Sequence, residues 1–211
     1  MSNAASIFVS TTQERKEQYT HRAYEGAVDV ANDNKFAVVP PGANTDIFNP
    51  DTPNQTEEKI QDKIGEVFAR DLAEDRQQLP AILLASRLDH KKNHVGAVKA
   101  FAQSEELQEK GNLVITLRGI NNPFADYSSA SGEEKEILDE IMDIIAEYDL
   151  QGKVSMFSLA SQKELAACYR TLAEYNSLFC LTAYYEPFGL APVAAIASGL
   201  PAVVTKNGGS S

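Results

Sequence analysis

The segment LFCLTAYYEPFGLAPVAAIASGLPAVV, residues 178–204, contains a complete strand–helix–strand pattern. The bare apolar runs Leu178–Leu181 and Ala202–Val204 have the length of strands and show no polar alternation. Between them, the alanine-rich stretch Leu190–Ser198 predicts a helix, and Pro192 is acceptable in its first turn. A helix that connects two uniformly apolar strands indicates a parallel sheet whose faces are both covered.

The same alternation continues through most of the chain. Further strands are expected at Ile7–Ser10, Phe36–Val39, Ala81–Ala85, Leu113–Leu117 and Lys153–Phe157, and helices at Thr12–Ala27, Glu57–Leu72, Asn93–Leu107, Glu133–Tyr148 and Gln162–Leu172. Thr11 or Thr12 is the expected cap of the first helix, and Ser161 with Glu164 forms a capping box before the last. Right-handed crossovers then predict an α/β fold with a doubly wound, Rossmann-like parallel sheet, which binds ligands at the carboxyl ends of its strands.

The composition argues against several kinds of partner. The formal net charge of −11 and the pI of about 4.7 disfavour nucleic acid, whereas a small phosphorylated ligand needs only one or two local cations. Cys168 and Cys180 lack metal spacing, as do His21, His90 and His94, which are interpreted as surface or packing residues. Neither a signal peptide nor an apolar run of 18 residues is found. A reduced, cytoplasmic protein with no membrane partner and no metal is expected.

The stretch ASRLDHKKNH, residues 85–94, places cations directly after a predicted strand. Arg87 leaves the strand end, and Lys91 and Lys92 precede a helix whose expected cap is Asn93. Cations beside a helix N-terminus can bind a diphosphate. The alternative interpretation of this stretch is a basic, solvated turn without a ligand. Arg118 also ends a strand, and it could reach the same ligand or pair with a surface acid.

The stretch YYEPFGLAP, residues 184–192, is the second candidate. The amides of Phe188 to Ala191 would open the following helix and form an anion site, and Glu186 just outside it could accept hydrogen bonds from sugar hydroxyls. The alternative is that Glu186 only complements the helix dipole. Two turns into the helix, Ala194 would share the side of Glu186 without offering a polar group. Gly208 and Gly209 would let backbone approach a ligand, or form a plain turn.

Together these motifs resemble the donor-binding half of the retaining, two-domain (GT-B) glycosyltransferases of the family that contains sucrose synthases and glycogen synthases. The family pattern is an Arg, a Lys five residues later, a Glu-x7-Glu motif around E-P-F-G-L, and a Gly-Gly loop. The chain is most similar to the sucrose-phosphate synthases, in the strings SRLDHKKNH, LRGINNPFADYS, GKVSMF and YYEPFGLAPVAAIASGLPAVVTKNGG.

The resemblance implies a nucleotide-sugar donor, UDP-glucose, with fructose 6-phosphate as acceptor and sucrose 6-phosphate as product, formed with retention. Arg87 and Lys92 would neutralise the diphosphate without a metal or another cofactor, and Glu186 would hold glucose hydroxyls. The resemblance implies that the segment from Phe188 through Gly189 to Leu190 binds phosphate or sugar oxygens of the donor. Met156 and Phe157 would lie beside the base. The loop of Gly208 and Gly209 would also contact the donor.

Ala194 stands where the family has the second Glu, which accepts hydrogen bonds from the ribose. The sequence leaves open whether this alanine is a natural variant or an engineered substitution. Either way, the missing charged acceptor is expected to weaken nucleotide binding.

The resemblance also predicts the domain organisation. Residues 1–35 would comprise a cloning scar, Met1–Ala4, and the last βα unit of the acceptor domain. Residues 36–211 would form the donor domain, incomplete at its C-terminus. Such a fragment is expected to bind donor without transferring the sugar on its own. A non-catalytic nucleotide-sugar-binding module and a related retaining glycosyltransferase with another acceptor are the alternatives.

Overall fold

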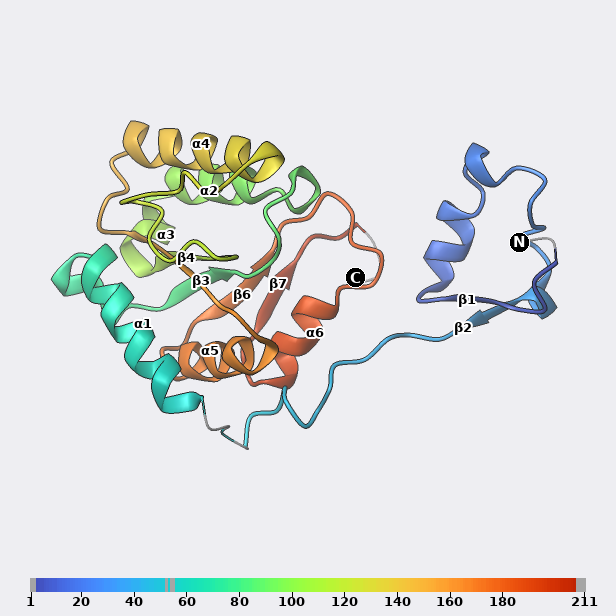
Figure 1. The fold of residues 1–211 in the computed structure, drawn as a ribbon, viewed down its shortest axis with the longest axis horizontal. Helices are drawn as coiled ribbons and strands as arrows, with labels where there is room; N and C mark the ends of the chain where they lie inside the picture. The colour runs from blue at the N-terminus through green and yellow to red at the C-terminus, as the bar shows by residue number, and fades with distance from the viewer. Residues whose placement is uncertain (1–2, 52, 54–55, 208–211) are drawn as a thin grey trace.

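A parallel five-stranded sheet forms the centre of the molecule (Figure 1). The computed structural model describes residues 3–51, 53 and 56–207. The sheet has the order β5-β4-β3-β6-β7 and consists of β3 (Ala81–Leu84), β4 (Asn112–Leu117), β5 (Val154–Ser158), β6 (Leu178–Leu181) and β7 (Ala202–Val204). Each neighbouring pair is parallel, so the predicted doubly wound α/β fold of a GT-B half is confirmed.

Helices cover both faces of this sheet (Figure 1). On one face α1 (Glu57–Asp71), α5 (Gln162–Glu174) and α6 (Leu190–Ala197) share a buried cluster with the strands. On the other face α2 (His94–Ala102) and α4 (Gly132–Glu147) form a second cluster. Burial on both faces explains why the strands read as continuous apolar runs.

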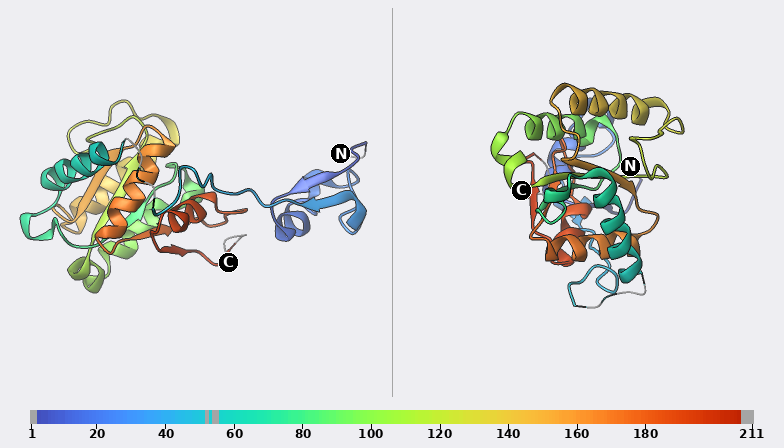
Figure 2. Two further views of the ribbon diagram at one scale, coloured as in Figure 1. Left: turned by 90° about the horizontal axis from the view of Figure 1, so that it is seen from below. Right: turned by 90° about the vertical axis from the view of Figure 1, so that its left-hand side faces the viewer.

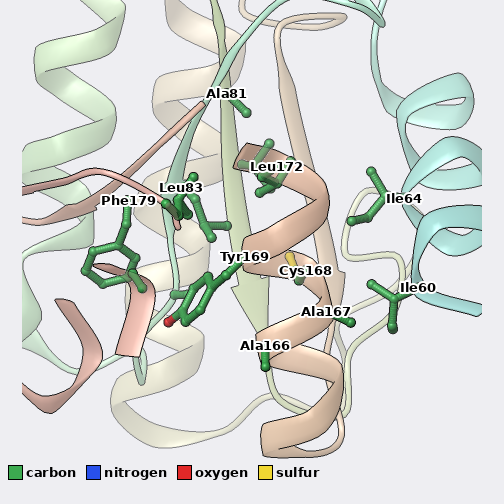
Figure 3. Close-up of a cluster of buried hydrophobic side chains, with 14 of the residues drawn as sticks. Ile60, Ile64, Ala81, Leu83, Ala166, Ala167, Cys168, Tyr169, Leu172 and Phe179 are labelled. Carbon is green, nitrogen blue, oxygen red and sulfur yellow. The ribbon is translucent and has the colours of Figure 1, made fainter. Parts of the chain in front are cut away.

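The first cluster is centred on α5 (Figure 3). Tyr169 and Cys168 are fully buried there, and the ring of Tyr169 meets that of Phe179 edge to face at 5.9 Å. Ile60 and Ile64 of α1 close the cluster from the side. The cluster therefore joins two helices to the sheet beneath the carboxyl ends of its strands.

An ion pair anchors the segment that leads into this domain. The guanidinium of Arg170 on α5 donates to both carboxylate oxygens of Glu57, at 3.0 and 2.7 Å, and both side chains are largely buried. Its remaining nitrogen, Nη1, donates to the carbonyls of Asn49 (3.0 Å) and Ile47 (3.3 Å). One side chain thus ties the incoming backbone and the start of α1 to α5.

The helix predicted over Asn93–Leu107 is two helices. After α2 ends, Ser104 adopts an extended backbone, and its hydroxyl accepts a hydrogen bond from the amide of Leu107 at 3.3 Å. This cap starts α3 (Glu105–Lys110) in a new direction. The predicted cap at Ser161 is confirmed, because its hydroxyl accepts from the amide of Glu164 at 3.2 Å.

The N-terminal residues form a small separate unit. Here β1 (Ile7–Val9) pairs in parallel with β2 (Phe36–Val38), and the amide of Val39 donates to the carbonyl of Val9. The strand β2, which follows the predicted boundary between residues 35 and 36, thus completes the sheet of this N-terminal unit. Figure 2 shows the unit to one side of the larger domain, at the end of an extended segment.

The helix predicted over Thr12–Ala27 is shorter than expected and ends at Gln18. Thr11 caps its start as expected, but after a π-helical stretch, Glu14–Gln18, the chain turns. The hydroxyl of Thr20 donates to the carbonyls of Lys16 and Glu17, and a separate 3₁₀ turn follows at Arg22–Tyr24. Side-chain hydrogen bonds to the backbone compete here with continuation of the helix. Within the described residues, no helix is long and apolar enough to span a membrane.

Candidate functional site

The carboxyl ends of β3 and β6 lie side by side at the point where the sheet changes winding direction. From β3 the chain crosses to β4 on one side, and from β6 it crosses to β7 on the other. Such a switch point opens a crevice between the two diverging loops. Arg87 and Lys92 follow β3, and Glu186 follows β6. The fold thus brings the cationic and the acidic candidates, far apart in sequence, to one edge.

Lys92 and Glu186 form a direct ion pair across this crevice. The ammonium of Lys92 donates to Oε2 of Glu186, and both side chains are largely buried. Two hydrogen bonds to backbone carbonyls hold the two loops together. The hydroxyl of Thr182 donates to the carbonyl of Lys92 at 3.2 Å, and the amide of Tyr184 donates to the carbonyl of Lys91 at 2.9 Å. Lys92 thus turns inward from the otherwise exposed basic turn His90–Lys92 and pairs with Glu186.

Arg87 is held far less tightly. Its side chain is 76% exposed, and its contact is with Asp89, 3.4 Å from Nη2 to Oδ2. Asp89 is in turn fixed by accepting a hydrogen bond from the amide of Lys92 at 3.0 Å. A guanidinium on such a loose contact can turn toward an anion at little energetic cost.

A cavity of about 550 Å³ opens beside Arg87 at the ends of β3, β4 and β5. This size is in the range of small-molecule sites. Arg118, at the end of β4, also faces the cavity, so two guanidinium groups line it. The remaining lining residues are mostly small or polar, and include Ser86, Thr116, Glu134, Ala160, Ser161 and Gln162.

The structure corrects the expected role of Met156 and Phe157. Both are fully buried, Met156 in the cluster under α4 and Phe157 in the cluster around α5. Their side chains stand perpendicular to the sheet and pack on the helices, so they cannot border a ligand at the strand ends. The cavity is lined instead by the loop that follows β5, from Leu159 to Gln162.

The start of α6 has the expected form. Gly189 takes the left-handed conformation, with φ of 90°, which a side chain would strain, and its carbonyl accepts from the amide of Val193. The amides of the first turn have no partner within their own helix, as at every helix start. Leu190 is exposed and Phe188 partly so. Gly208 and Gly209 lie outside the described residues.

Ala194 lies deeper than the sequence suggested. It is 7% exposed, and its methyl group belongs to the apolar cluster beneath α6. Its carbonyl accepts from the hydroxyl of Ser198 at 3.0 Å. A carboxylate at this position would start from a buried Cβ and would have to extend out of the cluster to reach the crevice.

His94, interpreted from the sequence as a surface or packing residue, is buried next to the lining of this cavity. It is 2% exposed, and its Nε2 lies 3.2 Å from the hydroxyl oxygen of Ser86, which lines the cavity. Burial lowers the pKa of His94 from 6.5 to about 4; the carboxylate of Asp89 raises this pKa, and the ammonium of Lys92 lowers it by less. The imidazole is therefore neutral at pH 7. The prediction that His94 is a surface or packing residue missed this contact.

The lowered pKa of His94 predicts acid sensitivity. As the pH falls through 6.5, the unfolded chain binds a proton at this ring, whereas the folded chain does so only near 4. Stability is therefore lost as the pH falls across this window, by about 3 kcal/mol. Urea unfolding of the wild type and of His94→Gln at pH 7 and pH 4 tests this. The wild type should lose more stability than the variant, and equal losses would contradict the assignment.

Comparisons with known proteins identify the family. The model of the glycosyl transferases group 1 matches residues 70–211. The chain belongs to the group 1 glycosyl transferases. The matched range contains Arg87, Lys92 and Glu186. These three residues therefore lie in the part of the chain that matches the family, and not in the small N-terminal unit.

The relatives of this glycosyl transferase agree with that assignment. It is 34% identical over 209 residues to a probable sucrose-phosphate synthase of Thermosipho melanesiensis, covering 99% of this chain and 41% of that protein. It is 34% identical over 187 residues to a sucrose synthase of Nitrosomonas europaea, covering 84% of this chain and 23% of that protein. The chain therefore spans less than half the length of these relatives.

A solved sucrose-phosphate synthase from Thermosynechococcus elongatus has the same fold, with a TM-score of 0.66 at 23% identity over 99% of this chain and 42% of that one. Within the described ranges, no three His, Cys, Asp or Glu side chains are grouped to hold a metal ion. That donor binding needs no metal stays a prediction.

Proposed function

We propose that this chain is the donor-binding half of a retaining glycosyltransferase, which binds UDP-glucose at the carboxyl ends of β3 and β6. The parent enzyme would transfer glucose to fructose 6-phosphate and give sucrose 6-phosphate. The observation that carries the proposal is the cluster of Arg87, Lys92 and Glu186 at the switch point. The sucrose-phosphate synthase relative supports the choice of donor and acceptor.

In the proposed reaction the bond between the glucose anomeric carbon and the β-phosphate oxygen breaks. Negative charge grows on the departing UDP, and cations already in place stabilise it. Arg87, which is exposed and loosely held, would turn onto the diphosphate, and Lys92 would exchange Glu186 for a phosphate oxygen. The carboxylate released in this way would then accept hydrogen bonds from glucose hydroxyls. The acceptor would be bound by parts of the parent outside this chain.

Calorimetry with UDP, UDP-glucose, ADP and GDP, without added metal, tests the proposal. UDP-glucose should bind more tightly than UDP, and the adenine and guanine nucleotides should bind more weakly. In Glu186→Gln the preference for UDP-glucose over UDP should fall by about tenfold, because the charged acceptor of the sugar hydroxyls is lost. Equal binding of all four ligands, or a preference that survives in Glu186→Gln, would contradict the proposed donor site.

The alanine at position 194 favours a second candidate function, a nucleotide-sugar-binding module without turnover. The group 1 motif has a carboxylate at this position by resemblance, and here a buried methyl group replaces it. Weaker nucleotide binding would suit a module that releases its ligand unchanged. Sugar transfer to any acceptor by the parent protein would decide against this candidate.

Restoring the missing acceptor should strengthen binding. Ala194→Glu is expected to tighten UDP binding by about tenfold, because a charged hydrogen-bond acceptor contributes about 1.5–3 kcal/mol. Calorimetry measures the affinity, and melting curves monitor the cost of the buried charge. Ile196→Glu, on the exposed side of the same helix, is the matched control. Unchanged affinity in a folded Ala194→Glu variant would show that position 194 does not face the nucleotide.

A further inference from the structure

Ser86 lines the same cavity as Arg87, one of the residues of the proposed donor site. Ser86 is the second residue after β3, is half-buried, and lines the cavity of about 550 Å³ next to Arg87. Its Oγ lies 3.2 Å from Nε2 of His94. A serine hydroxyl can donate one hydrogen bond and accept others, so what it offers the cavity depends on which partner donates in this contact.

His94 is the first residue of α2, and its ring is enclosed. Nδ1 is buried and has no hydrogen-bond partner among the described residues. Because the ring is neutral, only one of its two nitrogens carries a hydrogen. The direction of the contact with Ser86 therefore follows from the position of that hydrogen.

The surroundings of Nδ1 favour the hydrogen on Nε2. Nδ1 is the ring nitrogen nearer the backbone, at the N-terminal end of a helix, where the amide dipoles create a positive potential. The charges of Asp89 and Lys92 act on the ring in opposite directions, so we assign the hydrogen from the helix end alone. A lone pair is more stable than an N–H group in this potential. Nε2 then donates to Oγ of Ser86, and the serine must direct its own hydrogen elsewhere.

We propose that the Ser86 hydroxyl, oriented by its contact with His94, donates a hydrogen bond to an anionic diphosphate oxygen in the cavity beside Arg87. Ser86 would be a binding residue and His94 a positioning residue that acts through it. This inference rests on the proposed function, because it adds a neutral donor to the cationic groups of the same site.

Two variants of His94, one to glutamine and one to asparagine, separate the roles of its two ring nitrogens. His94→Gln places an amide near the position of Nε2 and can still donate to Ser86, whereas His94→Asn reaches only the position of Nδ1. UDP and inorganic pyrophosphate are titrated into the wild type, both variants, Ser86→Ala and the double variant Ser86→Ala/His94→Asn. Melting curves identify any variant that does not fold.

Ser86→Ala and His94→Asn should each weaken UDP binding by about tenfold, as expected for one hydrogen bond to a charged group. His94→Gln should stay close to the wild type, and the double variant should bind no more weakly than Ser86→Ala. Unchanged affinity in Ser86→Ala, or equal losses in the two His94 variants, would overturn the inference alone. A wild type that binds neither UDP nor pyrophosphate would refute the donor site as well.

Nitrogen NMR of the free protein gives a readout that needs no ligand. Long-range ¹⁵N–¹H spectra at pH 7 report the protonated ring nitrogen, and His94→Gln assigns the signal. The proposal requires the Nε2–H form. An Nδ1–H form would mean that Ser86 donates to His94 and has no hydrogen for a phosphate, which would overturn it.

Discussion

Replacing Arg87 with alanine is expected to weaken UDP binding by about 100-fold, the upper range for a hydrogen-bonded charge. The free energy of unfolding should change by less than about 0.5 kcal/mol, because the side chain is 76% exposed and its ion pair with Asp89 is long, at 3.4 Å. Calorimetry and urea unfolding measure the two quantities. Both measurements are needed, because substitution of a residue with a structural role would lower the UDP affinity and the free energy of unfolding together.

Arg22→Ala is the control for this variant. Arg22 is also an exposed arginine, but it lies in the small N-terminal unit and does not line the cavity. The Arg22→Ala substitution removes the same formal charge as Arg87→Ala. It therefore measures any general effect of net charge on the binding of a phosphorylated ligand. If Arg22→Ala and Arg87→Ala weaken UDP binding equally, the assignment of Arg87 to the diphosphate is wrong.

Replacing Glu57 with alanine is expected to lower the free energy of unfolding by about 3 kcal/mol. The guanidinium of Arg170 would stay buried while losing both hydrogen bonds to the carboxylate. The two hydrogen bonds of Arg170 to the carbonyls of Ile47 and Asn49 would remain, so only the bonds to the carboxylate would be lost. Urea unfolding measures this change.

Glu58→Ala is a matched control, because this neighbouring glutamate is exposed. It removes the same charge from the same first turn of α1, so its cost reports the helix-dipole contribution alone, about 0.5 kcal/mol. Similar losses in the two variants would show that the ion pair with Arg170 contributes little net stability.

The sequence predicted the sheet well because its strands are buried on both faces. The bounds of β6 and β7 agree with the prediction, and those of β3, β4 and β5 differ by a residue or so. A continuous apolar run between turn residues is a local signal. The placement of Arg87 and Glu186 at strand ends followed from the same signal.

Contacts between distant residues could not be predicted in this way. Glu186 lies 94 residues from Lys92, and nothing local to either residue indicates the pair. His94 looked like any helix-start residue, because its burial depends on how α2 packs on the sheet. Met156 and Phe157 were assigned to a ligand although a buried strand directs its side chains into the helix layers. The early end of the first helix at Gln18 is accompanied by hydrogen bonds from the Thr20 hydroxyl to the carbonyls of Lys16 and Glu17, which the periodicity of apolar residues does not reveal.

An NMR titration of the ¹⁵N-labelled chain with UDP tests the central claim most directly, because it locates the site. The account predicts saturable shifts concentrated in the loops after β3 and β6, at Ser86–Leu88, Lys91–His94 and Glu186–Leu190. Shifts confined to other surfaces, or no shifts at millimolar UDP, would contradict a donor site at the carboxyl ends of these strands.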